Sequence, residues 1–288
     1  MMGNCCCKTR RADFWNTTNA PPSTHTDWMK ALDESKSITD ISIPGTHESM
    51  ASTSAIPWVV CQSLSLGDQL QIGIRFFDIR CRLYTDDLLI YQNMFNLNFQ
   101  FTQCLTDMAD FLDKHPSEFL LVRVRDEYKS YHSDKSFSEA VRETLENSKA
   151  KLWSEEKVPT IGQAKGKIII LYDFSIAKDE RRPIGFPYRS LKWLNTEDLW
   201  NAHRFSEKWN AVKTHLETAF SQNKDNQIYL TYNSTALSIC TPCCIAKRLN
   251  PKLYEYINGQ HGRFGIIAMD YPGPKLVEKI INSNHNEN

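Results

Sequence analysis

The chain has 288 residues, of which 41% are hydrophobic and 24% are charged, a composition typical of a globular protein. Because 34 Lys and Arg residues balance 34 Asp and Glu residues, the chain lacks the positive charge of a nucleic-acid-binding protein, and we expect no nucleic-acid partner. The sequence also has neither the roughly 20 consecutive apolar residues that span a bilayer nor the apolar core of a secretory signal.

The chain begins with the unusual stretch "MMGNCCCKTRR", within residues 1–26 that we predict to form a flexible tail. If translation starts at the second methionine, Gly3 becomes an N-terminal glycine that can accept a myristoyl group. One acyl chain binds membranes only weakly, so palmitoylation of Cys5, Cys6 and Cys7 would supply the additional anchoring. The tail therefore indicates a lipid-anchored protein.

Two features of the tail leave an alternative open. Cys7 occupies the position where the myristoylation pattern usually has Ser or Thr, and initiation at Met1 would block acylation. The alternative is a disordered tail with free thiols. Nine cysteines, an odd number with three of them adjacent, do not fit a disulfide framework and favour a reducing cytosol. We therefore expect a cytoplasmic protein held on the inner face of a membrane.

From residue 27 onward, segments with strand-like and helix-like patterns alternate. The expected strands are Ile38–Ile43, Ile74–Leu83, Leu88–Tyr91, Phe119–Val124, Lys167–Phe174, Leu191–Leu194 (a weaker pattern), Gln227–Tyr232 and Phe264–Met269. The expected helices are Thr102–Lys114, Phe137–Lys151, Phe205–Ser221, Cys244–Asn258 and Pro274–Asn282. This alternation predicts an α/β fold with parallel strands, namely a (β/α)8 TIM-type barrel, distorted or incomplete in places, that occupies residues 27–288 as one domain.

The stretch "ISIPGTHESM" places chemically active residues directly after the first expected strand. Ile-rich sequence favours a buried strand, and we expect Pro44 and Gly45 to end it, so that His47 and Glu48 lie in the following loop. Histidine is the side chain that most readily exchanges a proton near neutral pH. His47 is therefore a candidate catalytic base, although most histidines have only structural roles.

Charged residues also follow two other strands that we expect to be neighbours of the first. In "IRFFDIRCR", Asp78 and Arg80 are two residues apart and so share one face of a buried strand, where each charge needs a partner. Asp270 follows the last strand, in "FGIIAMDYPG". Because the first, second and last strands are adjacent in a closed barrel, these groups would meet around His47 at one mouth. A structural ion pair is the alternative for Asp78 and Arg80.

The ordered set "SIPGTHES", "RFFDIRCR", "YLTYNS" and "IIAMDYPG" resembles the X domain of the bacterial-type phosphatidylinositol-specific phospholipases C. The resemblance implies that His47 takes the proton of the inositol 2-hydroxyl, which then attacks phosphorus and releases diacylglycerol and inositol 1,2-cyclic phosphate. It also implies that Asp270 orients His47, and that Arg80 holds the phosphate in place of a metal ion. We therefore expect no cofactor and no metal. Glu48 stands where the family usually has aspartate.

One departure from the family concerns the group that protonates the leaving oxygen. The family has a histidine after "LLIY", acting with the aspartate equivalent to Asp78, whereas this chain has Gln92, which cannot transfer a proton. Three interpretations stay open: a slow phospholipase, an enzyme for a substrate with a better leaving group, and a lipid-binding pseudoenzyme. We favour retained but impaired activity.

The resemblance also implies binding residues for the inositol ring and for the membrane. Arg125 resembles a basic residue at the end of the family's fourth strand, and Asp198 and Trp200 resemble an acid and an aromatic platform under the ring, although surface salt bridges and core packing would explain them equally well. Trp58, in "AIPWVVCQ", is a candidate membrane contact. We expect the partner to be a phosphatidylinositol-containing membrane surface and the protein to be a monomer.

Overall fold

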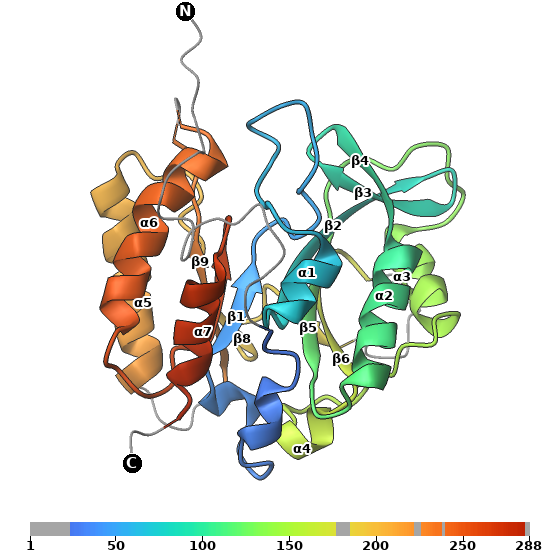
Figure 1. The fold of residues 1–288 in the computed structure, drawn as a ribbon. Coiled ribbons are helices and arrows are strands. Elements are labelled where there is room, and N and C mark those ends of the chain that lie inside the picture. Colours follow the sequence, from blue (N-terminus) through green and yellow to red (C-terminus); the bar gives the residue numbers. More distant parts are fainter. Residues whose placement is uncertain (1–23, 177–184, 222–225, 238–239, 286–288) are drawn as a thin grey trace, which may run out of the picture.

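The computed structural model describes residues 24–176, 185–221, 226–237 and 240–285, and in these ranges parallel strands form a curled sheet (Figure 1). The order of these strands is β7-β6-β5-β2-β1-β10-β9-β8. Their bounds are β1 Ile43–Thr46, β2 Phe76–Tyr84, β5 Leu120–Asp126, β6 Ile168–Asp173, β7 Phe186–Pro187, β8 Leu194–Glu197, β9 Ile228–Asn233 and β10 Ile266–Met269. This is the strand order of a (β/α) barrel, so the predicted fold class is confirmed in its incomplete form.

The barrel is open on one side. Within the described ranges, β7 pairs with β6 and β8 pairs with β9, and no backbone ladder joins β7 to β8. On the opposite side β1 pairs in parallel with both β2 and β10, as predicted. The carboxyl ends of β1, β2 and β10 therefore lie together, which is where the candidate catalytic residues follow.

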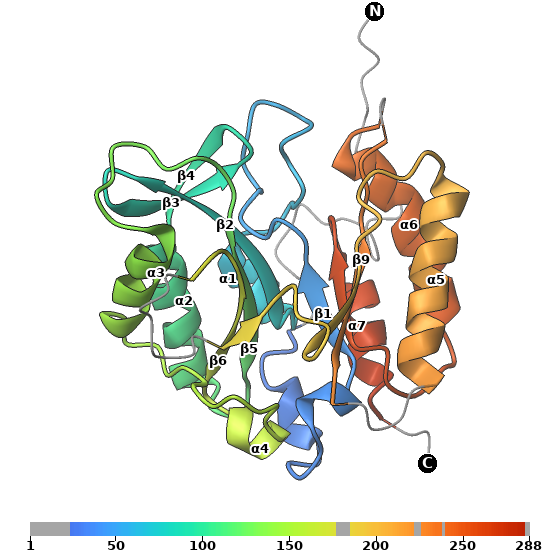
Figure 2. The same ribbon diagram turned by 180° about the vertical axis from the view of Figure 1, so that it is seen from behind.

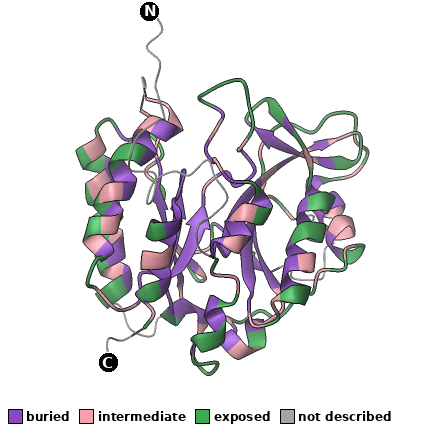
Figure 3. Cartoon of the chain, in the orientation of Figure 1, coloured by how far each residue is buried: buried purple, intermediate pink, exposed green. Residues whose placement is uncertain are grey.

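Helices cover the outside of the sheet (Figures 1 and 2). The α-helices in the described ranges are α1 Leu66–Gln71, α2 Phe101–Lys114, α3 Phe137–Glu146, α4 Ile161–Ala164, α5 Phe205–Ser221, α6 Pro242–Ile257 and α7 Pro274–Asn282. Figure 3 shows the strands of the parallel sheet largely buried and the helices exposed mainly on their outer sides, which is the amphipathic pattern that the sequence predicted. Among the described helices, none combines the length and apolarity needed to cross a bilayer.

The first expected strand was placed too early in the sequence. Residues Ile38–Asp40 form a short 3-10 helix because Ser37 and Asp40 make a reciprocal capping box at its start. The strand β1 instead runs through Pro44 and Gly45, so the prediction that these residues end the strand was wrong. A side chain at Gly45 would lie only 2.7 Å from the ring of Phe76, so glycine allows β1 to pack closely against β2.

A hairpin made of β3 (Asp87–Gln92) and β4 (Phe95–Gln100) extends from the end of β2. The segment Leu88–Tyr91 is therefore an antiparallel strand outside the barrel, and the short strand β7, which the sequence did not predict, takes a place in the parallel sheet. Asn93 adopts a positive φ of 51° in the two-residue turn, a conformation that asparagine tolerates. The hairpin brings Gln92 to the mouth of the barrel.

Two further boundaries differ from the prediction. The helix expected over residues 137–151 ends at Glu146, where Asn147 caps it. His25 and Thr26, which we assigned to the tail, contact the base of the barrel, because their carbonyl oxygens accept hydrogen bonds from buried Arg75. Glu118 balances the charge of Arg75 at 2.8 Å. The tail residues before Thr24 lie outside the described ranges, as do the predicted acylation sites Gly3, Cys5, Cys6 and Cys7.

Candidate active site

His47 and Asp270 follow neighbouring strands at the same height. Because Thr46 pairs with Met269 in the parallel ladder of β1 and β10, the next residue of each strand enters the mouth of the barrel beside the other. His47 Nδ1 lies 2.8 Å from Asp270 Oδ1, and Asp270 is buried. The carboxylate can only accept, so Nδ1 carries the proton and Nε2 is left with a lone pair.

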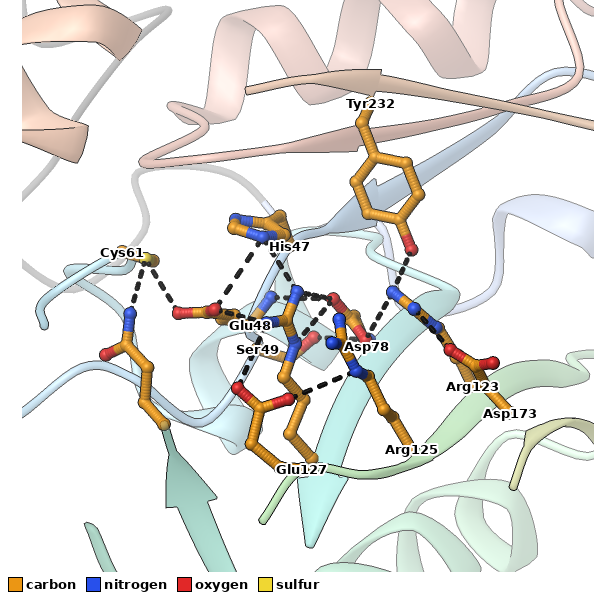
Figure 4. A network of polar contacts seen from close by, with 12 residues as sticks. His47, Glu48, Ser49, Cys61, Asp78, Arg123, Arg125, Glu127, Asp173 and Tyr232 are labelled. Carbon is orange, nitrogen blue, oxygen red and sulfur yellow. Dashed lines mark hydrogen bonds and ion pairs between the residues drawn. The ribbon is translucent and has the colours of Figure 1, made fainter. Parts of the chain in front are cut away.

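Arg80 approaches His47 from β2. Its Nη2 lies 3.0 Å from His47 Nε2, and because a guanidinium can only donate, this contact also requires a lone pair on Nε2. Carboxylates surround the same guanidinium: Glu48 at 2.6 Å, Asp78 at 3.1 Å and Glu127 at 3.4 Å. Figure 4 shows His47, Glu48, Asp78 and Glu127 turned toward this common centre.

The charges of this network determine its protonation state. Burial alone would raise the pKa of Asp78, but the charges of Arg80 and Arg123 outweigh it and hold this pKa far below its ordinary value. Burial lowers the pKa of His47, yet the negative charges of Asp270 and Glu48 outweigh that effect, and the net pKa of His47 is raised. The site therefore holds an ionised Asp78 carboxylate beside two guanidinium groups, and an imidazole that is a stronger base than usual.

Arg123 forms a second layer of charge that sequence reasoning missed. It pairs with Asp78 in the register of β2 and β5, and its guanidinium contacts Asp78 at 3.3 Å, Asp173 at 2.6 Å and the Tyr232 hydroxyl at 3.0 Å. Tyr232 in turn lies edge-on to His47. The sequence did contain a signal for Arg123, because it is flanked by valines in the middle of a buried strand. A charge at such a position needs partners, which marks it as part of a polar network.

Arg125 lies at the rim of the site. It faces the same side of β5 as Arg123, lies beside Arg80 in the register of β2 and β5, and forms an ion pair with Glu127 at 3.2 Å. Its side chain is 34% exposed, so it is open to solvent in a way that Arg123 is not. The structure thus places Arg125 beside the network rather than at its centre. The strand that carries it, β5, is the third parallel strand along the chain, not the fourth.

Asp198 and Trp200 follow β8 at the carboxyl end of the barrel. Glu197 pairs with Thr231 in the ladder of β8 and β9, so Asp198 is level with Tyr232. Burial, together with the charges of Asp78 and Asp198, raises the pKa of Tyr232 well above its ordinary value. Trp200 is 64% exposed, so one aromatic side chain is open to solvent near the mouth.

Gln92 and Cys61 occupy the other side of the imidazole. Gln92 is buried at the end of β3, and its Nε2 lies 3.6 Å from Cys61 Sγ. The Cys61 thiol donates to Glu48 Oε2 at 3.2 Å. Burial and the neighbouring charge of Glu48 raise the pKa of Cys61 well above its ordinary value, so the group is a thiol. Sequence reasoning missed Cys61, because nothing in the local pattern marks it as a site residue.

The side chain of Gln62 holds the loop after β1 in place. Gln62 Nε2 donates to the carbonyl oxygens of His47, at 2.6 Å, and Met269, at 3.0 Å, and so ties β1 to β10 directly beneath the imidazole. Glu48 has a positive φ of 43°, a strained backbone conformation that turns its carboxylate toward Arg80. The His47 side chain itself is 20% exposed, so the imidazole is not sealed from solvent.

Such an arrangement is suited to proton abstraction next to an anionic group. The imidazole is oriented by a buried carboxylate, which favours the protonated form after proton transfer. The guanidinium of Arg80, within hydrogen-bond distance of Nε2, can stabilise negative charge that develops on a substrate oxygen. The arrangement could therefore support general-base catalysis on a substrate with an anionic centre such as a phosphodiester.

Comparisons with known proteins find relatives over most of the chain. The family model "Phosphatidylinositol-specific phospholipase C, X domain" matches residues 41–173. The 1-phosphatidylinositol phosphodiesterase of Listeria monocytogenes is 28% identical over 290 residues, covering 94% of this chain and 88% of the relative. The protein of the same name from Staphylococcus aureus is 26% identical over 298 residues, covering 90% and 94%.

Solved structures agree with this. The phosphatidylinositol-specific phospholipase C from Listeria monocytogenes superposes with a TM-score of 0.79 at 26% identity and covers 91% of this chain and 100% of that one. A Staphylococcus aureus enzyme superposes with a TM-score of 0.82 at 23% identity, covering 91% and 98%, which shows the shared fold. The family model, the relatives and the fold show that this chain is similar to bacterial phosphatidylinositol-specific phospholipases C.

Proposed function

We propose that the chain cleaves phosphatidylinositol within the membrane surface. His47 Nε2 takes the proton of the inositol 2-hydroxyl, and that oxygen attacks the phosphorus of the same molecule. The bond from phosphorus to the diacylglycerol oxygen breaks and this oxygen takes a proton from water, so the products are diacylglycerol and inositol 1,2-cyclic phosphate. The relatives named 1-phosphatidylinositol phosphodiesterase and the lone pair on Nε2 support this reaction.

Arg80 performs the task that a divalent metal would have in a metal-dependent reaction of this kind. Its guanidinium lies next to the base, and it can donate hydrogen bonds to a phosphate oxygen as negative charge develops there. Asp78, Glu48 and Glu127 hold the guanidinium in place from the other sides. Asp270 stabilises the imidazolium that forms when His47 accepts the proton.

The departure of the diacylglycerol oxygen is the weak step of this mechanism. An alkoxide leaves poorly unless it is protonated, and the Gln92 amide can donate a hydrogen bond but no proton. We therefore expect slow cleavage. Gln92 also favours the second candidate function. In that case the chain would be a membrane-bound protein that binds inositol lipids without cleaving them.

The oriented imidazole favours catalysis over binding alone. A binding protein needs cations for the phosphate, which Arg80 and Arg123 would supply, but it does not need a His47–Asp270 pair at 2.8 Å that leaves a lone pair on Nε2 beside Arg80. This pair is the single observation that supports the proposed function most strongly.

Cleavage in the presence of a chelator tests this function. We expect the purified full-length chain to release inositol phosphate from vesicles that contain phosphatidylinositol, and to do so equally with calcium and with excess chelator, because Arg80 takes the place of the metal. The measurement is release of radiolabelled inositol phosphate into the aqueous phase. A strict calcium requirement would contradict the role of Arg80, and absence of any release would favour the binding function.

Exposed apolar side chains at the mouth of the barrel support contact with a membrane. Trp58 is 61% exposed in the loop between β1 and α1, Met94 is 61% exposed at the tip of the β3–β4 hairpin, and Trp200 is 64% exposed. The loop and the hairpin rise from the same end of the barrel (Figure 1). Tryptophan with neighbouring apolar residues is typical of membrane interfaces. The site would thus face the lipid headgroups.

The tail would supply the permanent anchor. This part of the proposal rests on the sequence "MGNCCC" alone and places the protein in the cytoplasm on the inner face of a membrane. We expect the full-length chain to sediment with membranes when expressed in cells, and the variant Gly3→Ala to become soluble, while the matched variant Asn4→Ala stays with the membranes. The measurement is the share of each chain in the membrane pellet. Equal pelleting of Gly3→Ala and the unaltered chain would refute myristoylation.

A further inference from the structure

Three side chains with different donor atoms converge beside the imidazole. A ring nitrogen of His47, a carboxylate oxygen of Glu48 and Cys61 Sγ all lie within 4.8 Å of one another. His47 Nε2 is 3.8 Å from Glu48 Oε1, and Cys61 Sγ is 3.2 Å from Glu48 Oε2. The ligands of a tetrahedral zinc ion, bound at about 2.0–2.3 Å, are roughly 3.3–3.8 Å apart. The three donors, one atom from each residue within 4.8 Å of the others, are therefore close to this spacing, and a bound zinc ion would draw them together.

Gln92 offers a fourth donor, because its side-chain oxygen lacks a hydrogen-bond partner. Its side chain is only 6% exposed, and its Oε1 is buried without a hydrogen-bond partner. In the structure Nε2 faces Cys61 Sγ at 3.6 Å, and the opposite assignment of the amide, which exchanges its two end atoms, would direct Oε1 to Cys61 instead. A buried unsatisfied carbonyl oxygen is costly, and a cation is one partner that would satisfy it.

The groups behind the donors are those that a bound metal requires. A histidine ligand usually donates its other ring N–H to a carboxylate, and His47 Nδ1 does so to Asp270 at 2.8 Å. Glu48 divides its oxygens: Oε1 contacts Arg80 at 2.6 Å, and Oε2 faces Cys61. Arg80 keeps Asp78 and Glu127 as partners when Nε2 turns to a metal.

The local charge also favours a cation. Four carboxylates, those of Glu48, Asp78, Glu127 and Asp270, lie in one network with three guanidinium groups, those of Arg80, Arg123 and Arg125, so the carboxylates exceed the guanidinium groups by one. A thiolate and an imidazole select zinc over calcium or magnesium, which prefer oxygen ligands alone. Binding would replace the thiol proton of Cys61 by the metal, and that proton would pass to solvent.

We propose that His47, Glu48 and Cys61, with Gln92 as fourth donor, form an inhibitory binding site for Zn²⁺. The bound ion would occupy the lone pair of Nε2, which the proposed reaction uses as its base. The inhibitory part of this inference rests on the proposed function, whereas the binding part does not. The chain would then be inactive while zinc is bound and active after its removal.

Titration with Cd²⁺ tests the site without any measurement of activity. Cadmium bound to thiolate gives an ultraviolet charge-transfer band, and calorimetry with Zn²⁺ gives the affinity. The comparison uses the full-length chain with Cys5→Ser, Cys6→Ser and Cys7→Ser, so that the tail thiols do not bind the probe. The test variant is Cys61→Ala, and the matched control is Cys104→Ala, because both thiols are 1% exposed and free.

We expect the Cys104→Ala chain to bind one more equivalent of Cd²⁺ than the Cys61→Ala chain. The zinc affinity of Cys61→Ala should fall by at least the roughly 10–100-fold that even a change outside the ligand shell causes. His47→Asn, at a partly exposed position, should lower the affinity similarly if Cys61→Ala folds poorly. Equal stoichiometry and affinity in Cys61→Ala and Cys104→Ala, or unchanged affinity in His47→Asn, would overturn the proposal.

Activity separates the two proposals. Zn²⁺ should inhibit the Cys104→Ala chain at least tenfold more strongly than the Cys61→Ala chain. A chain that cleaves phosphatidylinositol but binds no zinc at Cys61 would overturn only the zinc site. A chain that binds zinc at Cys61 but cleaves no phosphatidylinositol would overturn only the proposed function.

Discussion

We expect the substitution His47→Asn to lower the rate of phosphatidylinositol cleavage by at least about 10²–10⁴-fold. Asparagine can keep a hydrogen bond to Asp270 but cannot take the proton of the inositol 2-hydroxyl. The measurement is the release of inositol phosphate at saturating substrate, with circular dichroism to show that the variant is folded.

A matched control exists at the other end of the barrel. His115 caps α2 and contacts Asp27, and its side chain is 19% exposed, against 20% for His47. We expect His115→Asn to keep its activity within about threefold, because that position is remote from the proposed base. Equal losses in the two variants, or retained activity in His47→Asn, would show that another group is the base.

The substitution Gln92→His should raise the rate of cleavage, by up to about 10²–10⁴-fold if protonation of the leaving oxygen limits the reaction. Gln92 lines a small cavity together with Glu48, Asp78 and Arg80, so an imidazole at this position is next to the reacting groups. Unlike an amide, an imidazole can donate a proton to the diacylglycerol oxygen as it leaves.

The control for this gain is Gln92→Leu, which changes the packing at the same position and offers no proton. We expect its rate to stay at or below that of the unaltered chain. If Gln92→His is no faster than Gln92→Leu, leaving-group protonation does not limit the reaction. If neither the unaltered chain nor Gln92→His releases inositol phosphate, the binding function is correct.

The strand pattern made the centre of the site predictable from the sequence. Strand periodicity put Asp78 and Arg80 on one face, and the barrel topology put His47 and Asp270 at adjacent strand ends, where they are found. These inferences need only the period of a strand and the order of strands in a barrel. They do not depend on loop geometry.

Other parts of the site depend on features that a sequence pattern does not carry. Cys61 reaches Glu48 through a loop whose path is set by hydrogen bonds of Gln62 to two carbonyl groups. The two-residue strand β7 is too short to give a periodic signal. For Arg123 and Arg125, which share one face of β5, only the position along the strand decides which one reaches the centre.

Local capping also outweighed hydrophobic pattern at one place. The apolar run from Ile38 looks like the start of a strand, but Ser37 and Asp40 close a capping box and form a 3-10 turn instead.

The local signal also failed at Pro44 and Gly45. These residues are typical of a strand end, yet both lie inside β1, and the close approach of Phe76 requires a residue without a side chain at position 45. Contacts with the neighbouring strand overrode the local signal.

The pH dependence of kcat/KM in the unaltered chain and in Asp270→Asn tests most directly whether a single oriented imidazole is the base. The pKa of His47 is raised above its ordinary value of 6.5, and only the deprotonated form can take a proton. We expect kcat/KM to fall as the pH drops through a value above 6.5, and the Asp270→Asn variant to show this fall at lower pH, because it lacks one of the charges that raise the pKa. An identical acidic limb in the two chains would contradict the account.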